Sequence, residues 1–581
     1  MKFLQNLLAS ILGFFIALFL IFIFFALVAS LVGGGSKVIV EPNSILELDL
    51  TTSIKDYAPK DESPLAQALE LTNNKLSLDQ IMNAIDNAKE DENIKGISVK
   101  TLYVNAGMAQ TQALRNKLEE FKESGKFVYA YGDFFDQKNY YLSSVADSVF
   151  MNPLGAIDFK GLNAEILYYK DFEDKLGVKM EVIRHGKYKS AVEPYLSNKM
   201  SDANREQTLS FLNSIWSEIT DDISINRSIS VTKLNEIADN SNGRNAELAV
   251  KNNLIDGSIY EDEYEVKLGK QVNKDFDMVT IEDYIASGKG RKSSLSKNKI
   301  AVIYAQGQIF YGEGTDNIIG QGIINRAIRK AKKNKSVKAI VLRVNSPGGS
   351  ALASELIWRE LQLAKEEKPL VVSMGNVAAS GGYYIASIAD KIIAEPTTIT
   401  GSIGVFGTVP NVSKLADKIG INAEQVSTNE SANYSLYEPM NKKFYEVTKE
   451  GVEQVYTTFL ERVADGRNMT LEEADEVAQG RVWTGKEALE NGLVDSLGSL
   501  EDAINIAADL AEIEDYRIRS YPNYKKDLKE TLKLSPFSKT TKEEMVKEVL
   551  GDESYEMYKV ISQFKNLKGI QARMPYVFEI K

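Results

Sequence analysis

The chain contains one segment twice, and this internal duplication restricts the fold more than any other feature of the sequence. Residues 132–141, GDFFDQKNYY, align with residues 375–384, GNVAASGGYY. The flanks keep the same register: Ile94-Lys95 with Val337-Lys338, and Ala146-Asp147 with Ala389-Asp390. The polar residues are divided unevenly, because Gln137 stands where the second copy has Ser380. The duplication therefore indicates one fold present twice, with each half supplying a different part of one site.

Composition excludes several kinds of site. At 581 residues, with 44% hydrophobic and 26% charged residues, the chain suits two globular domains of ordinary size. A formal net charge of −12 disfavours nucleic acid as a partner. Cysteine is absent and His185 is the single histidine, so thiolate catalysis, Cys-based metal sites and multi-His metal sites within one chain are excluded. We expect no cofactor and no metal.

The N-terminus has the pattern of a membrane segment. Leu7 to Val32 is apolar almost throughout, and no charge occurs between Lys2 and Lys37. As a helix it would span roughly 39 Å at 1.5 Å per residue, more than the hydrocarbon core of about 30 Å. A cleavable signal peptide has a shorter apolar region, so we predict an uncleaved anchor, with cleavage as the alternative. Lys2 and the terminal amine lie before the apolar segment and only Lys37 follows it. This distribution favours an N-terminus inside the cytoplasm and a body outside it.

The rest of the chain alternates strand and helix patterns, which predicts an α/β fold with parallel sheets. Strands are expected at 37–50, 94–99, 299–304, 339–344 and 370–374, and helices at 78–88, 318–332, 353–365 and 382–389. The predicted organisation is an anchor at 1–36, an N-terminal repeat domain at 37–286, a polar linker at 287–297, a C-terminal repeat domain at 298–522, and a charged, helical extension at 523–581.

Two glycine-rich turns of the second copy could carry chemistry. Ser380 is expected between a strand and a helix N-terminus, where free N–H groups and the helix dipole favour developing negative charge. The turn Pro347-Gly348-Gly349 follows a neighbouring strand, and its N–H groups could form an oxyanion hole. Either turn alone could be a purely structural strand-to-helix connection. Both are absent from the first copy, which favours a functional role.

A serine nucleophile needs a base, and the candidate bases lie in the other half. Residues 184–194 of the first copy, RHGKYKSAVEP, contain His185 and Lys189. The corresponding residues 427–434 of the second copy contain neither Lys nor His. Either side chain could instead have no catalytic role, since most lysines lie on the surface and many histidines only hydrogen-bond to nearby groups. A Ser-His-Asp triad would have to use His185.

Four strings together resemble the signal peptide peptidase A (protease IV) family in its long, duplicated form: RVNSPGGS at 343–350, AASGGYY at 378–384, TGSIG at 400–404 and YKSAVEP at 188–194. The resemblance covers nearly the whole chain. It implies two tandem ClpP/crotonase-like domains, Ser380 as the nucleophile, Lys189 as the general base, and Ser402 as a residue that hydrogen-bonds the lysine. It also implies a homotetramer with dyads completed between halves, either within one chain or between neighbouring chains.

The chemistry of a Ser-Lys pair agrees with this resemblance. A free lysine is neutral in only about one molecule in 2,500 at pH 7, but burial in an apolar site lowers its pKa. The N–H groups around Gly349 and Gly381 would hold the oxyanion. His185 beside the lysine motif departs from the small or apolar residue expected in relatives, and it leaves a Ser-His enzyme as an alternative.

The sequence therefore predicts a membrane-anchored serine endopeptidase that degrades hydrophobic peptides, chiefly released signal peptides. Its body would lie on the periplasmic side of a bacterial inner membrane. Two alternatives stay open. A crotonase-like acyl-CoA enzyme would share the glycine-rich turn but would need a carboxylate acid/base and a CoA site, and a non-catalytic membrane scaffold would retain only the fold.

Overall fold

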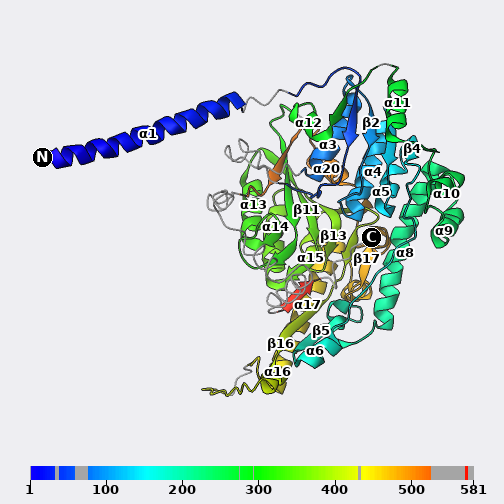
Figure 1. Cartoon of the computed structure of the whole chain (residues 1–581). Helices are drawn as coiled ribbons and strands as arrows, with labels where there is room; N and C mark the ends of the chain where they lie inside the picture. The colour runs from blue at the N-terminus through cyan, green and yellow to red at the C-terminus, as the bar shows by residue number, and fades with distance from the viewer. Residues whose placement is uncertain are drawn as a thin grey trace.

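Two mainly parallel sheets, one in each half of the chain, form the body of the molecule (Figure 1). The computed structural model describes residues 2–32, 38–58, 76–273, 275–291, 294–429, 434–524 and 570–573. A third sheet contains strands from both halves. This arrangement confirms the predicted α/β class.

The first sheet has the order β6-β4-β3-β2-β1-β7, and all its pairings are parallel. Its strands are β1 (Ser44–Leu48), β2 (Ile94–Val99), β3 (Phe127–Gly132), β4 (Ser148–Met151), β6 (Gly257–Ser258) and β7 (Met278–Thr280). The helices of this half are α3 (Leu78–Glu90), α4 (Met108–Lys122), α5 (Gln137–Ser143), α6 (Lys170–Leu176), α7 (Glu193–Leu196), α8 (Asp202–Arg227), α9 (Val231–Asp239), α10 (Ala246–Lys251), α11 (Glu261–Val272) and α12 (Ile281–Ala286).

The second sheet repeats this order and extends it. Its main path is β17-β15-β13-β11-β8-β19, with β14 beside β13 and β18 beside β14. Its strands are β8 (Lys299–Gln306), β11 (Val337–Ser346), β13 (Leu370–Ala379), β14 (Lys391–Ala394), β15 (Ile399–Gly401), β17 (Val482–Thr484), β18 (Ser496–Leu497) and β19 (Arg517–Tyr521). The helices are α13 (Gln321–Lys333), α14 (Ala351–Lys365), α15 (Gly381–Ala386), α16 (Ser413–Lys418), α17 (Lys442–Arg467), α18 (Leu471–Val477), α19 (Gly485–Glu490) and α20 (Leu500–Leu510).

Equivalent side chains make equivalent hydrogen bonds in the two halves. The hydroxyl of Tyr140 donates to the carbonyl of Leu254 at 2.8 Å, and that of Tyr383 donates to the carbonyl of Leu493 at 2.8 Å. Arg227 pairs with Asp256, as Arg467 pairs with Asp495, at 2.8 Å in both cases. The duplication predicted from the sequence is thus repeated in these side-chain contacts.

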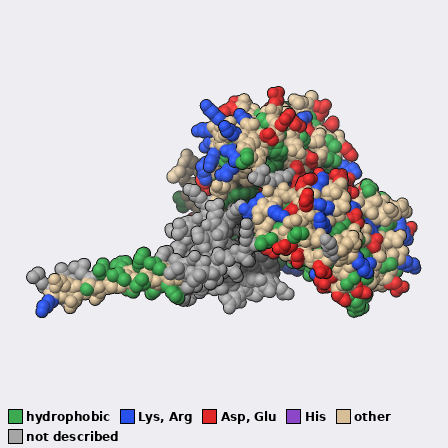
Figure 2. Space-filling model, turned by 90° about the horizontal axis from the view of Figure 1, so that it is seen from above, with side chains coloured by type: hydrophobic (Ala, Val, Ile, Leu, Met, Phe, Trp, Pro, Cys, Tyr) green, Lys and Arg blue, Asp and Glu red, His purple; other side chains and the backbone are tan. Residues whose placement is uncertain are grey.

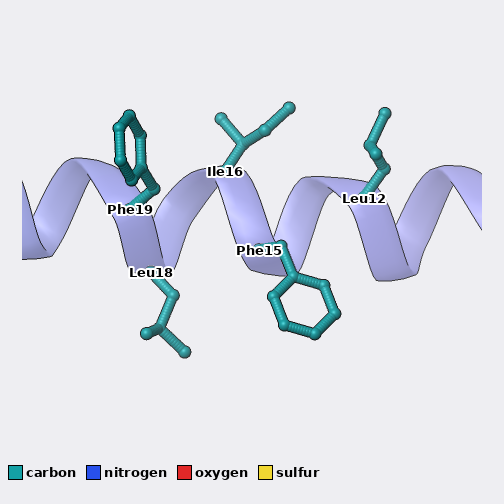
Figure 3. A pocket seen from close by; sticks show the side chains of 5 residues that line it. All are labelled: Leu12, Phe15, Ile16, Leu18 and Phe19. Atoms are coloured by element: carbon teal, nitrogen blue, oxygen red, sulfur yellow. The ribbon is translucent and has the colours of Figure 1, made fainter.

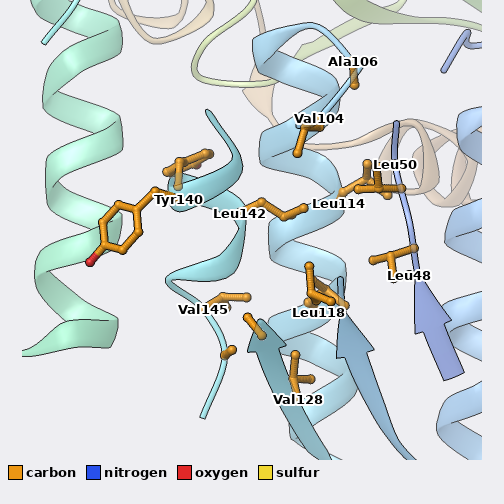
Figure 4. Packing of buried hydrophobic residues seen from close by; sticks show 14 of the residues in the cluster. Leu48, Leu50, Val104, Ala106, Leu114, Leu118, Val128, Tyr140, Leu142 and Val145 are labelled. Atoms are coloured by element: carbon orange, nitrogen blue, oxygen red, sulfur yellow. The ribbon is translucent and has the colours of Figure 1, made fainter. Parts of the chain in front are cut away.

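The hydrophobic core of the first half also includes residues of the second half. Leu48, Leu114 and Leu118 are fully buried in it, between the sheet and its helices (Figure 4). Ala379 and Val482, both from the second half, belong to the same cluster. Burying a leucine side chain contributes about 1.5–3 kcal/mol. The two halves therefore share buried apolar surface.

The third sheet has the order β10-β9-β12-β20-β16-β5. Its strands are β5 (Lys179–His185), β9 (Gln308–Phe310), β10 (Ile318–Gly320), β12 (Gly348–Ser350), β16 (Val405–Asn411) and β20 (Ile570–Arg573). β5 of the first half pairs antiparallel with β16 of the second, from His185 opposite Val405 to Lys179 opposite Asn411. This pairing brings the segment after β5 against the second half.

Several boundaries differ from the sequence prediction. The strand expected to end at Met374 continues to Ala379, and residues 318–320, expected as helix, form β10. Of the strand expected at 37–50, only Ser44–Leu48 is strand, and residues 33–37 lie outside the described residues. Most of the extension expected to be helical also lies outside them, and its described residues 570–573 form a strand.

Helix α1 (Lys2–Val32) projects from the body as an arm (Figure 1). Hydrophobic side chains gather on this arm, whereas charged side chains are scattered over the body (Figure 2). Leu12 and Phe15 point to opposite sides of α1 (Figure 3) and are 65% and 63% exposed. Among the residues described here, no helix combines the length and the apolar character that crossing a membrane requires.

Candidate active site

Ser380 lies at the junction of β13 and α15, in a strained backbone conformation. Its φ of 56° and ψ of −116° are unusual for a residue with a side chain, and such conformations cost roughly 1–3 kcal/mol. Its N–H donates to the carbonyl of Gly401 at 2.8 Å, and its carbonyl accepts from the N–H of Tyr384 at 2.8 Å. These bonds hold the turn. The side chain is completely buried.

Lys189 of the first half contacts Ser380 of the second. It follows β5 and precedes the short 3₁₀ turn Ser190–Val192. Its Nζ lies 3.0 Å from Ser380 Oγ, 3.0 Å from the carbonyl oxygen of Ser402 and 3.1 Å from Ser402 Oγ. The structure thus brings together, within one chain, the three side chains that the sequence analysis singled out.

Burial lowers the pKa of Lys189 well below the usual 10.5, since the side chain is completely inaccessible to solvent. A neutral amine has two N–H groups and one lone pair. Donation to the two Ser402 oxygens leaves the lone pair for the hydroxyl hydrogen of Ser380. The three contacts therefore match the hydrogen-bonding capacity of a neutral lysine, the form that can accept a proton.

The segment around Lys189 is held from both halves. The guanidinium of Arg184 donates to the carbonyl of Lys189 at 3.1 Å. The side chain of Gln207, on α8, donates to the carbonyl of Tyr188 at 3.0 Å and accepts from the N–H of Val482 at 3.2 Å. Gln207 carries no motif, so sequence reasoning missed it. It links the lysine segment to strand β17 of the second half.

Two glycines form the wall against which Lys189 packs. A Cβ at Gly480 would lie 2.6 Å from the backbone nitrogen of Lys189, and one at Gly404 would lie 3.1 Å from its Cδ. Gly404 belongs to the TGSIG string, but Gly480 lies in no recognised string and was missed. The φ of +79° marks Gly480 as a special backbone position, but this angle is known only from the structure.

Gly480→Ala is expected to lower kcat/KM on the order of 10²-fold, because the added Cβ displaces the lysine backbone and misplacements of about 1 Å have such effects. Gly125→Ala is the matched control. Gly125 has the same φ of +79° but open space around its Cβ position, so it reports backbone strain alone. Steady-state kinetics on a peptide substrate measure both, and equal activities of the two variants would show that the wall at Gly480 has no role.

The backbones of Gly348, Gly349 and Gly381 converge beside the serine. A Cβ at Gly348 would lie 2.6 Å from the nitrogen of Gly381, and one at Gly381 would lie 3.2 Å from the nitrogen of Gly349. Gly348 and Gly349 have φ values of +93° and +155°. Because side chains are absent here, the two N–H groups can be approached by a carbonyl oxygen, as an oxyanion hole requires.

His185 lies outside this constellation. Its Nδ1 is 2.6 Å from a carboxylate oxygen of Glu453, and its ring stacks on Tyr456 with centroids 3.8 Å apart. Ser380 is not among its partners. In the first copy, the side chain of Gln137 bonds within its own half, accepting from the N–H of Gly161 at 2.9 Å.

Comparisons with known proteins agree with the duplicated fold. The model of peptidase family S49 matches residues 120–274 and 362–514. Protease 4 of Haemophilus influenzae is 38% identical over 81% of this chain and 80% of its own. The chloroplastic serine protease SPPA of Arabidopsis thaliana is 33% identical over 82% of this chain and 70% of its own.

Solved structures show a weaker likeness. A ClpP1 mutant from Listeria monocytogenes matches with 13% identity and a TM-score of 0.24, over 35% of this chain and 94% of its own. This score does not establish a shared fold. The ClpP/crotonase-like assignment of the two domains therefore stays a prediction.

A duplicated α/β chain of this kind, with the relatives just described, is a serine peptidase. The chain belongs to peptidase family S49, with two copies of the family domain. The family resemblance predicted from the four sequence strings is thereby confirmed.

Proposed function

We propose that this serine peptidase uses Ser380 and Lys189 as a catalytic dyad and degrades hydrophobic peptides, chiefly released signal peptides. The observation that carries the proposal is the 3.0 Å contact between Lys189 Nζ and Ser380 Oγ in a fully buried site. Ser-Lys pairs are a known variant of the activated hydroxyl. A neutral lysine at this distance is within reach of the proton that it must accept.

In the proposed mechanism, Ser380 Oγ attacks the carbonyl carbon of the substrate while its proton passes to Lys189 Nζ. The N–H groups of Gly349 and Gly381 stabilise the oxyanion. Lys189 then gives the proton to the leaving amine, and the peptide bond breaks. Water hydrolyses the resulting ester by the same route in reverse, with Lys189 again as the base. Ser402 holds the amine in position through both of its oxygens.

A membrane anchor and a homotetramer complete the proposal. The exposed apolar side chains of α1 support an anchor, with the body on the periplasmic side of a bacterial inner membrane. Resemblance of the four strings to signal peptide peptidase A supports the substrate class and the tetramer.

Deleting residues 1–36 is expected to move the protein from the membrane to the soluble fraction after cell lysis. A deletion variant that still sediments with membranes would contradict the anchor.

A fluorophosphonate probe tests the site itself. It is expected to form a stable adduct with Ser380, because only an activated serine reacts readily with such reagents. Mass spectrometry of the digested protein locates the adduct, and Ser380→Ala is the control. An unlabelled wild-type protein would favour a non-catalytic scaffold, whereas hydrolysis of an acyl-CoA but not of a hydrophobic peptide would favour the crotonase-like alternative.

A further inference from the structure

Strand β13 is irregular just before it reaches Ser380. It pairs with β11 at the centre of the second sheet, and the register of this pairing shifts between Val344 and Ser346. Three residues of β13, 375–377, occupy the stretch that the single residue Asn345 spans on β11. We call these three residues the β13 bulge. A bulge bends its strand and redirects the side chains that follow, so this one affects where Ser380 points.

A carboxylate from the first half lies beside this bulge. Asp56, in the segment after β1, is buried, and its Oδ1 accepts from Nε and Nη2 of Arg343 at 3.0 and 2.8 Å. Its Oδ2 accepts from Nδ2 of Asn345 at 2.6 Å. Nη1 of Arg343 donates to the carbonyl of Met374 at 2.7 Å. Asp56 therefore holds two side chains of β11 just before the glycine turn at 347–349.

Asn345 connects this carboxylate to the backbone of the β13 bulge. Its Oδ1 accepts from the N–H of Val377 at 3.3 Å, while its Nδ2 donates to Asp56. Gly375 leaves the space that these groups need. A Cβ at Gly375 would lie 3.0 Å from Asp56 Oδ2 and 3.0 Å from both Cβ and Cγ of Asn345. The bulge is thus built around a carboxylate that belongs to the other half of the chain.

The equivalent positions of the first copy carry other residues. Lys100 stands where the second copy has Arg343, and Leu102 stands where it has Asn345. Lys100 pairs instead with Glu261, and Leu102 is 57% exposed. The strands β2 and β3 of this copy keep one register along their pairing. The polar cluster and the bulge therefore accompany the nucleophile and are not part of the framework that the two copies share.

We propose that Asp56 is a positioning residue, which acts through Asn345 to hold the β13 bulge and thereby orients Ser380. This inference rests on the proposed Ser-Lys mechanism. In that mechanism the serine must stay within reach of both Lys189 and the oxyanion donors, and a misplacement of about 1 Å costs roughly 10²-fold in rate. The first half thus contributes to catalysis twice, since it supplies the base and also supports the strand that carries the nucleophile.

Exchanging the two polar groups tests the inference. Asp56→Asn turns an amide N–H group toward Nδ2 of Asn345, so two donors face each other. This variant is expected to lower kcat on a hydrophobic peptide by about 10²-fold with little change in KM. The double variant Asp56→Asn/Asn345→Asp again places a donor opposite an acceptor and keeps an oxygen for the N–H of Val377. It is expected to recover most of the lost kcat. Steady-state kinetics and thermal unfolding measure all variants.

Gly375→Ala tests the same contact without removing a polar group, and it keeps the inference falsifiable if Asp56→Asn does not fold. Its methyl group displaces Asp56 and Asn345 by a few tenths of an ångström, so kcat is expected to fall about tenfold, less than a 1 Å shift would cause. Gly257→Ala is the matched control. Neither glycine has a positive φ, and a Cβ at Gly257 meets only Phe150, at an ordinary contact distance of 3.4 Å.

The outcomes separate this inference from the proposed function. An Asp56→Asn variant that unfolds at a lower temperature but keeps the wild-type kcat has lost only stability, which overturns the positioning role and leaves the proposed function standing. A double variant that stays as slow as Asp56→Asn, or equal kcat values for Gly375→Ala and Gly257→Ala, also overturns it. A wild-type enzyme that neither hydrolyses the peptide nor reacts with the fluorophosphonate contradicts the proposed function, and the positioning role falls with it.

Discussion

Ser380→Ala is expected to lower kcat on a hydrophobic peptide by about 10⁶-fold, because removing the nucleophile of a coupled catalytic unit removes most of its rate enhancement. The protein should remain folded. Ser380 Oγ has Lys189 as its partner, and the backbone bonds that hold the turn do not involve the hydroxyl. Steady-state kinetics, with circular dichroism to check the fold, measure the effect.

Gln137→Ala is the control that the duplication provides. Gln137 occupies the corresponding turn of the first half, at the start of α5, and bonds to the loop at Gly161 without touching the dyad. Its loss should destabilise that loop by about 1 kcal/mol and leave kcat nearly unchanged. Substantial peptidase activity in purified Ser380→Ala would refute the assignment of the nucleophile.

The central part of the site could be predicted from the sequence because the duplication shows which residues differ between copies. Ser380 stands out against Gln137, and the lysine segment of the first copy stands out against a second copy without a base. The structure places these residues in contact through the β5–β16 pairing. That pairing joins segments more than two hundred positions apart, and no local sequence pattern predicts it.

Other parts of the site depend on tertiary contacts that leave no trace in the sequence. Gly480 matters because the backbone of Lys189 passes within van der Waals distance of it, and Gln207 matters because it lies between Tyr188 and Val482. Strand β20 lies in a charged region whose composition suggested helix. Its β conformation is stabilised by the two strand edges that it joins, and composition alone contains no information about those edges.

The choice between lysine and histidine as the base gives the second large expected effect. Lys189→Ala should lose activity to the same extent as Ser380→Ala, because the two side chains act as one unit. Lys189→Met should be equally inactive, and its similar length and apolar character keep the buried site filled. Lys189→Arg should not restore activity, since a guanidinium stays protonated and cannot accept a proton. Measuring kcat/KM for the three variants tests the lysine.

His185→Ala is the matching test of the alternative base. The ring bonds Glu453 and stacks on Tyr456, so its loss should cost about 1 kcal/mol of stability and leave most of the activity. An inactive His185→Ala variant, together with an active Lys189→Ala variant, would overturn the Ser-Lys assignment and favour a Ser-His enzyme.

The pH dependence of kcat/KM reports on the base independently of mutation. Burial lowers the pKa of Lys189, and only the neutral amine can take the proton from Ser380. Below that pKa the lysine is charged and the enzyme is inactive, so activity should rise with pH and level off above the pKa. The midpoint of this limb should lie well below the 10.5 of an ordinary lysine. A midpoint near the ordinary lysine pKa of 10.5 would mean that Lys189 is solvated in the working enzyme, contrary to its complete burial here.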